Sequence, residues 1–218
     1  MLRRVAELME ASMTVNPLVS LIARGEADRT TTLAALALEQ RWVIPADRRA
    51  FLHLAQRAAS DAPESAAFFT LLAEGEALAE ERLGAFAAAC GVTKASAAAY
   101  QPLPGCQAYP AYVAWLALNA APAEAVLALT ANFSTWGGYC ATIAEALRRH
   151  YGFTDEACAF FDFFAEPSAD LDRKATAAIR AGRDAGQVDE ERARRYGHLL
   201  QSYEELFWST LRGPVPRA

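Results

Sequence analysis

Glu204 has the residue type and the position that acid–base chemistry requires. It lies one helical turn before Trp208, in a segment where Leu200 and Phe207 recur at helical spacing and predict a buried face. A carboxylate on that face would be desolvated, and desolvation raises the pKa of a carboxyl group. A raised pKa adapts such a group to proton transfer near neutral pH. The alternative is a solvated Glu204 at the edge of the core, like its neighbour Glu205, and the spacing alone leaves both interpretations open.

Two adjacent glycines, Gly137 and Gly138, lie inside a segment that is otherwise typical of a helix. Each glycine destabilises a helix by about 1 kcal/mol relative to alanine, so we expect a compensating contact. That contact is either a flat ligand against the bare backbone or a closely packed second helix, and both remain open. Ser134 and Gly138 share a helical face, with Tyr139 beside them. These polar groups next to bare backbone favour the wall of a small-molecule pocket.

Four glutamates, Glu74, Glu76, Glu80 and Glu81, crowd the segment 64–90. Glu74 and Glu81 are seven positions apart and share a helical face. Two inward carboxylates could hold a divalent metal ion together with a second helix. No histidine is near them in the sequence, and the Glu-x-x-His pattern of dinuclear sites is absent. The spacing therefore favours a solvated face, and no metal site is predicted.

The composition describes an acidic globular protein. Its 218 residues are 53% hydrophobic and 22% charged, with a formal net charge of −5. The sequence has no basic tract and no charge-free apolar run of about 18 residues, so neither a nucleic-acid interface nor a membrane span is expected. The N-terminus MLRRVAELMEAS contains Glu7 and Glu10 and does not resemble a signal peptide. Four cysteines without a Cys-x-x-Cys pattern indicate reduced thiols, and we predict a cytoplasmic location.

The elements that must position these residues are helices. Alanine is abundant, β-branched residues are sparse, and no stretch alternates with a period of two. We expect a short helix from Pro17 to Gly25, and a kink or a break at Pro45, after which Asp47 begins a new segment. Residues 101–107 form the clearest loop. The other helices are expected at 30–43, 64–90, 122–150, 153–165, 169–184 and 189–211.

Short connections and the absence of a linker predict one all-α domain over residues 1–218, with about seven to nine helices. An interior pocket is expected between the helices at 30–43, 64–90, 122–150 and 189–211. This arrangement would place Glu204 and the glycine pair in one enclosed space.

Four stretches of the sequence, taken together, match the pattern of one superfamily. They are NPLVSLIARGEADRTTTLAALALEQRW, EGEALAEERLGAFAAACGV, WGGYCATIAEALRRHYGFTDEACAFFDFFAE and the C-terminal EELFW. The combination resembles the heme-oxygenase-like superfamily, in the branch of the TenA thiaminase-II proteins, the PqqC oxidases and their iron-dependent oxygenase relatives. The resemblance extends from about Asn16 to Trp208. It implies an all-α, heme-oxygenase-like helical bundle with an interior pocket.

The resemblance also implies roles for particular residues. Glu204 stands where the ExxFW ending of TenA has its catalytic glutamate, and it would act as general acid or base. Tyr139 would donate a hydrogen bond, and we predict it as the second catalytic residue. Arg41 and Trp42 occupy the family's Gln-Asp-Tyr triplet, where Arg41 would hold an anionic group of a ligand. The other expected substrate-binding residues are Glu74, Ser134, Gly138 and Asp170.

The sequence departs from the family pattern at several positions. Ser134 stands where thiaminase-type TenA proteins have a cysteine. Arg41 replaces the aspartate that holds the aminopyrimidine, and a guanidinium cannot accept the amino protons of that ring. Phe164 and Arg173 stand where metal-binding members have histidines, and no histidine occurs in the first 50 residues to ligate haem. We therefore predict no metal and no cofactor, and metal analysis of the purified protein is expected to find no stoichiometric iron, zinc or haem.

Three functions remain open. The first is a TenA/PqqC-like protein that binds a small aromatic or heterocyclic molecule and processes it without metal, as a cofactor-independent oxidase or hydrolase. The second is a TenA-like aminopyrimidine hydrolase of thiamine metabolism, in which Glu204 alone activates water. The third is a non-catalytic ligand-binding or regulatory protein. The resemblance further implies a homodimer or homotetramer.

Overall fold

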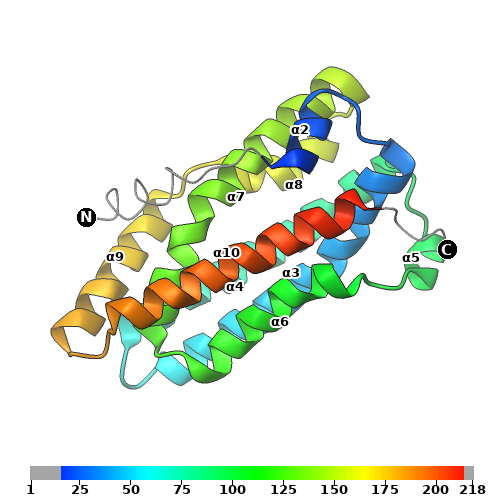
Figure 1. The fold of residues 1–218 in the computed structure, drawn as a ribbon. Helices are drawn as coiled ribbons and strands as arrows, with labels where there is room; N and C mark the ends of the chain where they lie inside the picture. The colour runs from blue at the N-terminus through cyan, green and yellow to red at the C-terminus, as the bar shows by residue number, and fades with distance from the viewer. Residues whose placement is uncertain (1–15, 214–218) are drawn as a thin grey trace.

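The computed structural model describes residues 16–213 of the chain (Figure 1). This part consists of nine α-helices and one turn of π-helix, with no strand. The elements are α2 (Pro17–Ala23), η1 (Arg29–Leu33), α3 (Ala34–Ala58), α4 (Pro63–Ala89), α5 (Lys94–Ala99), α6 (Pro104–Asn119), α7 (Pro122–Tyr151), α8 (Asp155–Ala165), α9 (Ala169–Asp184) and α10 (Glu190–Arg212). The predicted all-α class is confirmed for these residues, and none of the helices in this part of the chain has the length and apolar character to cross a bilayer.

Local sequence explains where most of these helices begin and end. The Asn16 side chain accepts hydrogen bonds from the first two backbone N–H groups of α2 that follow Pro17, at 3.0 and 3.2 Å. Proline at the first helical position begins α4, α6 and α7, where a missing N–H removes no helical hydrogen bond. Helix α6 therefore begins at Pro104, inside the predicted loop 101–107. Gly152 ends α7 with a φ of +66°, a conformation that favours glycine.

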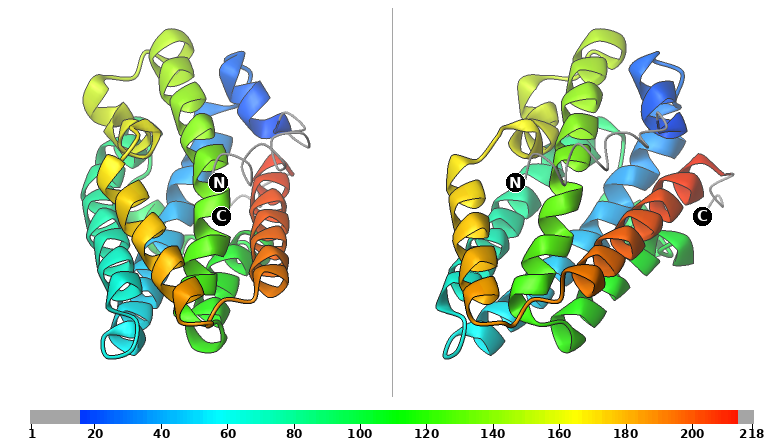
Figure 2. Two further views of the ribbon diagram at one scale, coloured as in Figure 1. Left: turned by 90° about the vertical axis from the view of Figure 1, so that its left-hand side faces the viewer. Right: turned by 60° about the vertical axis from the view of Figure 1, so that its left-hand side comes forward.

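The long helices form a closed ring around the axis of the bundle. In Figure 1, α10 lies in front between α7 and α6, and α3 and α4 lie behind it. Helix α6 packs against α10 and α3, and α4 packs against α3, α8 and α9. Helix α7 packs against α8, α9 and α10 and so completes the ring. Figure 2 shows α4 and α10 on opposite sides of the bundle.

Two apolar clusters form the core. The first apolar cluster joins the N-terminal half of α3 to α8 and to the C-terminal halves of α4 and α7, and it includes Leu36, Phe86, Leu147, Phe160 and Phe161. The second apolar cluster joins the C-terminal half of α3 to α6, α9 and the N-terminal halves of α4 and α7, and it includes Phe51, Phe68, Phe69, Leu116 and Leu129. The helices that cross from one cluster to the other pass through a boundary between them.

Helix α3 is continuous through Pro45, so the predicted break there is wrong. A proline inside a helix leaves the carbonyl of the fourth preceding residue, here Arg41, without its helical partner. Because Arg41 lies on the exposed side of α3, solvent can bond that carbonyl. The helix therefore continues, and Asp47 is a buried residue in its middle rather than the first residue of a new segment.

Candidate functional site

A layer of polar side chains separates the two apolar clusters. It consists of Asp47 on α3, Glu76 on α4, Tyr109 on α6, Asn132 on α7 and Glu204 on α10, and we call it the central polar layer. One residue comes from each of the helices α3, α4, α6, α7 and α10. Asp47, Asn132 and Glu204 are buried, and Glu76 and Tyr109 are partly buried. Polar groups are costly inside a protein unless they are hydrogen-bonded, so this layer calls for a physical explanation.

The position of the layer follows from the cluster memberships along each helix. On α10, Leu200 belongs to the second apolar cluster and Phe207 to the first, with Glu204 between them. On α3, Ile44 belongs to the first cluster and Ala50 to the second, with Asp47 between them. Tyr109 packs against both clusters.

Glu204 is buried with only one of its two oxygens partnered. Its side chain is 7% exposed, and its Oε1 accepts a hydrogen bond from the Trp208 indole Nε1 at 3.1 Å. Its Oε2 is buried, and although the Asn132 amide lies close to the carboxyl group, no described residue makes a hydrogen bond of good geometry to Oε2. Burial raises the pKa of Glu204 above its ordinary value, the charge of Glu205 adds to this rise, and the Trp208 indole and the Asn132 amide oppose it. A free acceptor with a raised pKa suits proton exchange.

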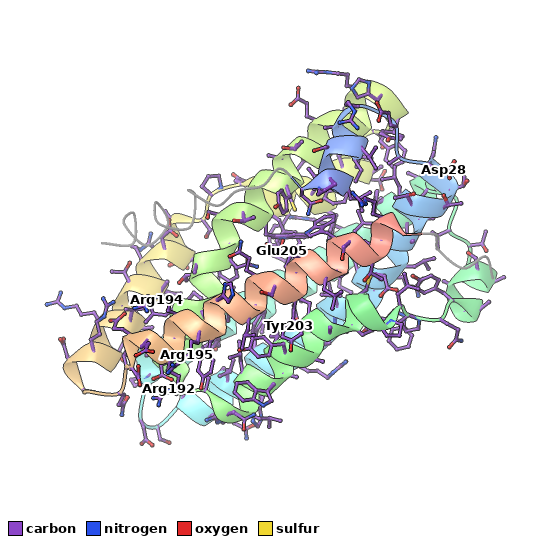
Figure 3. The ribbon with its side chains drawn as sticks, viewed as in Figure 1. Asp28, Arg192, Arg194, Arg195, Tyr203 and Glu205 are labelled. Atoms are coloured by element: carbon purple, nitrogen blue, oxygen red, sulfur yellow. The ribbon has the colours of Figure 1, made fainter. Side chains whose placement is uncertain are left out.

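A small cavity lies beside this carboxylate. It has a volume of about 20 Å³, and its walls come from Asn16, from α7 and from α10. The lining residues are Asn16, Thr135, Tyr139, Gln201, Glu204, Glu205 and Trp208. Figure 3 shows Glu205 on the side of α10 that faces α7, and this side chain is exposed, so the cavity reaches the surface next to it. The volume is enough for one group the size of a water molecule.

Tyr139 and Trp208 form the aromatic wall of the cavity. Their ring centroids are 5.6 Å apart at an interplanar angle of 86°, an edge-to-face contact. Burial and then the Glu204 charge raise the pKa of Tyr139, and a hydrogen bond with the Asn16 side chain partly offsets the rise. Trp136 packs on the Trp208 ring with centroids 5.9 Å apart. The wall therefore holds the indole in the orientation that Glu204 requires.

The part of the central polar layer formed by Asp47, Glu76 and Tyr109 also contains a carboxyl oxygen without a hydrogen-bond partner. Asp47 is 5% exposed, and its Oδ1 is buried without a partner among the described residues. Burial raises the pKa of Asp47 well above its ordinary value, and burial together with the Asp47 charge does the same for Glu76. Burial and then the charges of Asp47, Glu204 and Glu76 raise the pKa of Tyr109. Tyr109 thus lies within electrostatic reach of all three carboxyl groups.

Two buried carboxylates elsewhere show what a structural role looks like in this fold. Glu39 accepts hydrogen bonds from the Tyr100 hydroxyl at 2.6 Å, from Gln107 Nε2 at 2.7 Å and from the Leu103 backbone. Glu124 pairs with Arg192 at 2.6 Å and accepts the Asp189 backbone N–H. Glu39 and Glu124 are fully bonded, whereas Glu204 and Asp47 each have an oxygen free.

The structure brings some of the predicted site residues together and separates others. Glu204 and Tyr139 line one cavity. Ser134 and Gly138 lie on the exposed side of α7, and the neighbouring Thr135 reaches the cavity instead. A Cβ on Gly137 would lie 3.1 Å from the Phe164 carbonyl oxygen, so the predicted close contact with a second helix is confirmed for Gly137. No described atom lies within 4 Å of a Cβ placed on Gly138, so the prediction is wrong for Gly138.

The remaining predicted residues lie outside the cavity. Arg41 and Trp42 are exposed on α3, with Trp42 at 50%, because the face opposite to Asp47 is turned to solvent. Glu74 is exposed on α4, where Glu76 is the glutamate turned toward Asp47. Asp170 pairs with Arg173 at 2.9 Å and with Lys174 at 3.4 Å near the start of α9. Of the four helices expected around an interior pocket, α7 and α10 line this cavity.

Sequence reasoning missed Asp47, Glu76, Tyr109 and Asn132. A usable pattern existed for Asp47, since a helical stripe of apolar residues runs through Val43, Ile44, Ala50 and Phe51 and is interrupted by one carboxylate. The assumed break at Pro45 concealed it.

The described residues do not fit a haem or an iron centre. The histidines His53, His150 and His198 are all exposed, so no histidine faces the interior as an axial ligand. Within residues 16–213, no three histidine, cysteine or carboxylate side chains gather closely enough to hold a metal ion.

Comparison with known proteins is informative at the level of the fold. No protein-family model and no curated protein matches the sequence. The structure is similar to the crystal structure of a domain of unknown function with a heme oxygenase-like fold from Shewanella denitrificans, with a TM-score of 0.69 and 16% sequence identity. The match covers 96% of this chain and 88% of that one. The chain therefore has a heme oxygenase-like fold.

Proposed function

We propose that the protein binds a small aromatic or heterocyclic molecule between α7 and α10 and processes it by acid–base chemistry at Glu204, in the manner of TenA and PqqC proteins. The observation that supports this most directly is the free, buried Oε2 of Glu204 beside a cavity. An unpartnered buried acceptor is destabilising by about 1–3 kcal/mol, and functional sites commonly retain such groups.

The arrangement around Glu204 assigns separate tasks to its two oxygens. Oε1 is held by the Trp208 indole, which orients the carboxyl group. Oε2 is free to accept a proton from a ligand or to donate one to it. Tyr139 lines the same cavity and would donate a hydrogen bond to the ligand from its hydroxyl group. These roles match the geometry that general acid–base catalysis requires.

The size of the cavity limits what enters it. About 20 Å³ accommodates one polar group, so the body of a ligand would lie toward the opening beside Glu205. The rings of Tyr139 and Trp208 provide an apolar surface for a flat molecule at this position.

The test is a substitution that preserves shape and removes the titration. We expect a screen of small heteroaromatic compounds by thermal shift to find ligands for the wild-type protein. Glu204→Gln should lower kcat for a processed ligand by about 10²–10⁴-fold, the usual contribution of a general acid or base. Glu80→Gln, an exposed carboxylate on α4, is the matched control and should be unchanged. Binding without turnover by the wild-type protein would indicate a non-catalytic ligand-binding protein instead.

A second candidate is a TenA-like aminopyrimidine hydrolase. Arg41, at the position of the family's substrate-holding aspartate, is exposed, but Asp47 places a carboxylate on the interior face of the same helix. A carboxylate there could accept the amino protons that Arg41 cannot. Release of the hydrolysed pyrimidine by the wild-type protein, and its loss in Asp47→Asn, would favour this candidate. We also propose that the protein forms a homodimer or homotetramer. Light scattering during size-exclusion chromatography measures its mass in solution and tests this proposal.

A further inference from the structure

We infer that the cavity beside Glu204 accepts the ammonium head group of an organic amine, with the carboxyl groups of Glu204 and Glu205 supplying the opposite charge. This inference rests on the proposed function and specifies the charge of its ligand. It replaces the expectation that Arg41 holds an anionic group, because Arg41 lies outside the cavity.

Among residues 16–213, the walls of the cavity contain negative and aromatic groups and no base. Glu204 and Glu205 contribute two carboxylates, and Tyr139 and Trp208 contribute two ring systems. The other lining residues, Asn16, Thr135 and Gln201, are neutral and offer oxygen acceptors. Carboxylates attract an ammonium group directly, and aromatic rings attract it through their negative faces. An anion placed there would meet repulsion from both glutamates.

Further carboxyl groups lie in the interior around Tyr109. Asp47 and Glu76 add two more carboxyl groups around Tyr109. Within the described residues, the central polar layer contains no lysine, arginine or histidine, and the arginines nearest to Asp47 in sequence, Arg48 and Arg49, are exposed. No basic group is among the causes that raise the pKa values of Asp47, Glu76 and Glu204. An arriving cation therefore meets no competing positive charge from the described residues that line the cavity.

The free acceptors match the donors of an ammonium group. Glu204 lines the cavity and its Oε2 lacks a donor, and Asp47 Oδ1, outside that lining, lacks one as well. A primary ammonium has three N–H donors on one small centre. A cavity of about 20 Å³ is of the size of that head group, and the exposed Glu205 marks the opening through which the rest of the amine would extend.

Protonation partly neutralises the carboxyl groups in the absence of a bound cation. The release of these protons on binding is therefore a second measurement that tests the inference. Burial raises the pKa of Glu204, so part of the population holds a proton in the range where an ordinary carboxyl group has lost it. An ammonium group favours the ionised carboxylate. Binding should therefore release protons, and affinity should increase as the pH rises through the titration of Glu204. A neutral ligand that accepts a hydrogen bond from protonated Glu204 would show the opposite pH dependence.

The experiment compares three probes of one shape and different charge. Benzylammonium, benzyl alcohol and benzoate are titrated into the full-length protein while the indole N–H resonance of Trp208 is followed by NMR, with Trp208→Phe used to assign it. We expect benzylammonium to shift this resonance with at least about tenfold higher affinity than the other two. Calorimetry in two buffers of different ionisation enthalpy should detect proton release on binding.

Variants locate the binding site. Glu204→Gln and Glu205→Gln should each weaken benzylammonium binding by about tenfold or more, and Glu80→Gln should leave it unchanged. Circular dichroism and the other indole resonances report whether each variant is folded. If Glu204→Gln does not fold, Glu205→Gln and the proton release of the wild-type protein decide the question.

Three outcomes would overturn the inference: equal affinity for benzyl alcohol or benzoate, no shift of the Trp208 resonance with benzylammonium, or a shift with magnesium ions but not with the amine. The proposed function fails separately. If the protein turns over a neutral heteroaromatic ligand and this turnover depends on Glu204, the proposed function stands and the charge assigned to the ligand is wrong. If the protein binds the amine but Glu204→Gln does not affect turnover, the charge assignment stands and the proposed function is wrong.

Discussion

At the scale of single residues, opposing influences set the proton affinity of Glu204. Burial raises its pKa, whereas the Trp208 indole and the Asn132 amide lower it. The hydrogen bond at 3.1 Å joins residues four positions apart on one helix. The indole that lowers the pKa of Glu204 is therefore held on the same helix as the carboxylate. A ligand that enters the cavity meets a carboxyl group already fixed in orientation.

Replacing Trp208 tests that tuning. Trp208→Phe removes the indole N–H, so the pKa of Glu204 should rise further above its ordinary value, because the ionised form loses a donor. The free energy of unfolding should fall by about 1–3 kcal/mol, since a buried carboxyl oxygen is left without its partner. The titration is followed by carbon-detected NMR of the Glu204 side chain, and stability by urea unfolding.

Trp42→Phe is the matched control for this experiment. Trp42 is half-exposed on α3 and lies outside the lining of the cavity, so its replacement should alter stability by less than about 0.5 kcal/mol. Equal effects of the two substitutions would show that the indole N–H of Trp208 has no special role.

At the scale of helices, Asp47 and Glu76 bring two carboxyl groups together between α3 and α4. Burial raises the pKa of both, so the folded chain binds protons more tightly at these groups than the unfolded chain does. Their contribution to stability is complete below the unfolded pKa, near 4, and is lost as the pH rises toward the folded pKa. Each group can contribute a slope of up to about 1.4 kcal/mol per pH unit within that window.

Asp47→Asn should flatten this part of the pH profile. We expect the wild-type protein to lose stability relative to Asp47→Asn as the pH is raised from about 4 toward neutrality, because the variant has no carboxyl group to ionise. Asp61→Asn, an exposed position before α4, should leave the profile parallel to that of the wild type. Urea unfolding at several pH values measures the difference, and parallel curves for Asp47→Asn would contradict the burial of a titrating group.

The two glycines of α7 also act at the scale of helices, and the structure separates their roles. Gly138→Ala should stabilise the protein by up to about 1 kcal/mol, because the position is open and alanine is the better helix former. Gly137→Ala should gain less or destabilise, because its Cβ would lie 3.1 Å from the Phe164 carbonyl oxygen. Thermal unfolding of both variants checks the difference in sign or size, and equal gains would contradict the close approach of α7 and α8.

At the scale of the whole molecule, an ion pair joins α7 and α10 at the end of the bundle away from the cavity. Figure 3 shows Arg192 at the N-terminal end of α10, and this guanidinium pairs with the buried Glu124 of α7 at 2.6 Å. The two helices that line the cavity are therefore joined at one end by an ion pair and along their length by packing. Separation of α7 from α10 near the cavity would leave this end in place.

Removing that ion pair should affect stability more than removing an exposed one. Arg192→Ala leaves Glu124 buried with only the Asp189 backbone N–H as partner, and we expect a loss of about 1–3 kcal/mol. Arg195→Ala removes an exposed pair with Glu191 on the same helix and should cost at most about 0.5 kcal/mol. Urea unfolding of both variants makes the comparison, and similar losses would indicate that Glu124 is reached by solvent.

Much of the helical framework could be predicted because its determinants are local. Pro122 and Gly152 mark the ends of α7, and the sequence segment 64–90 matches α4 within one residue at either end. Pro45 is the instructive failure. Its effect on a helix depends on whether solvent reaches the freed carbonyl of Arg41, and that exposure is a property of the packed molecule.

The amino-acid sequence by itself determined the all-α class and most helix ends, because each depends on residues within about two turns of one helix. It left a buried and a solvated Glu204 both open, and the packing of α10 decided for burial. Only the tertiary structure decided that Asp47 and Glu76 face each other, that Arg41 faces solvent, and that Asn16 reaches a cavity between α7 and α10. Helical periodicity specifies which residues share a face. It does not specify which helix covers that face, since that choice is made by packing between segments far apart in the chain.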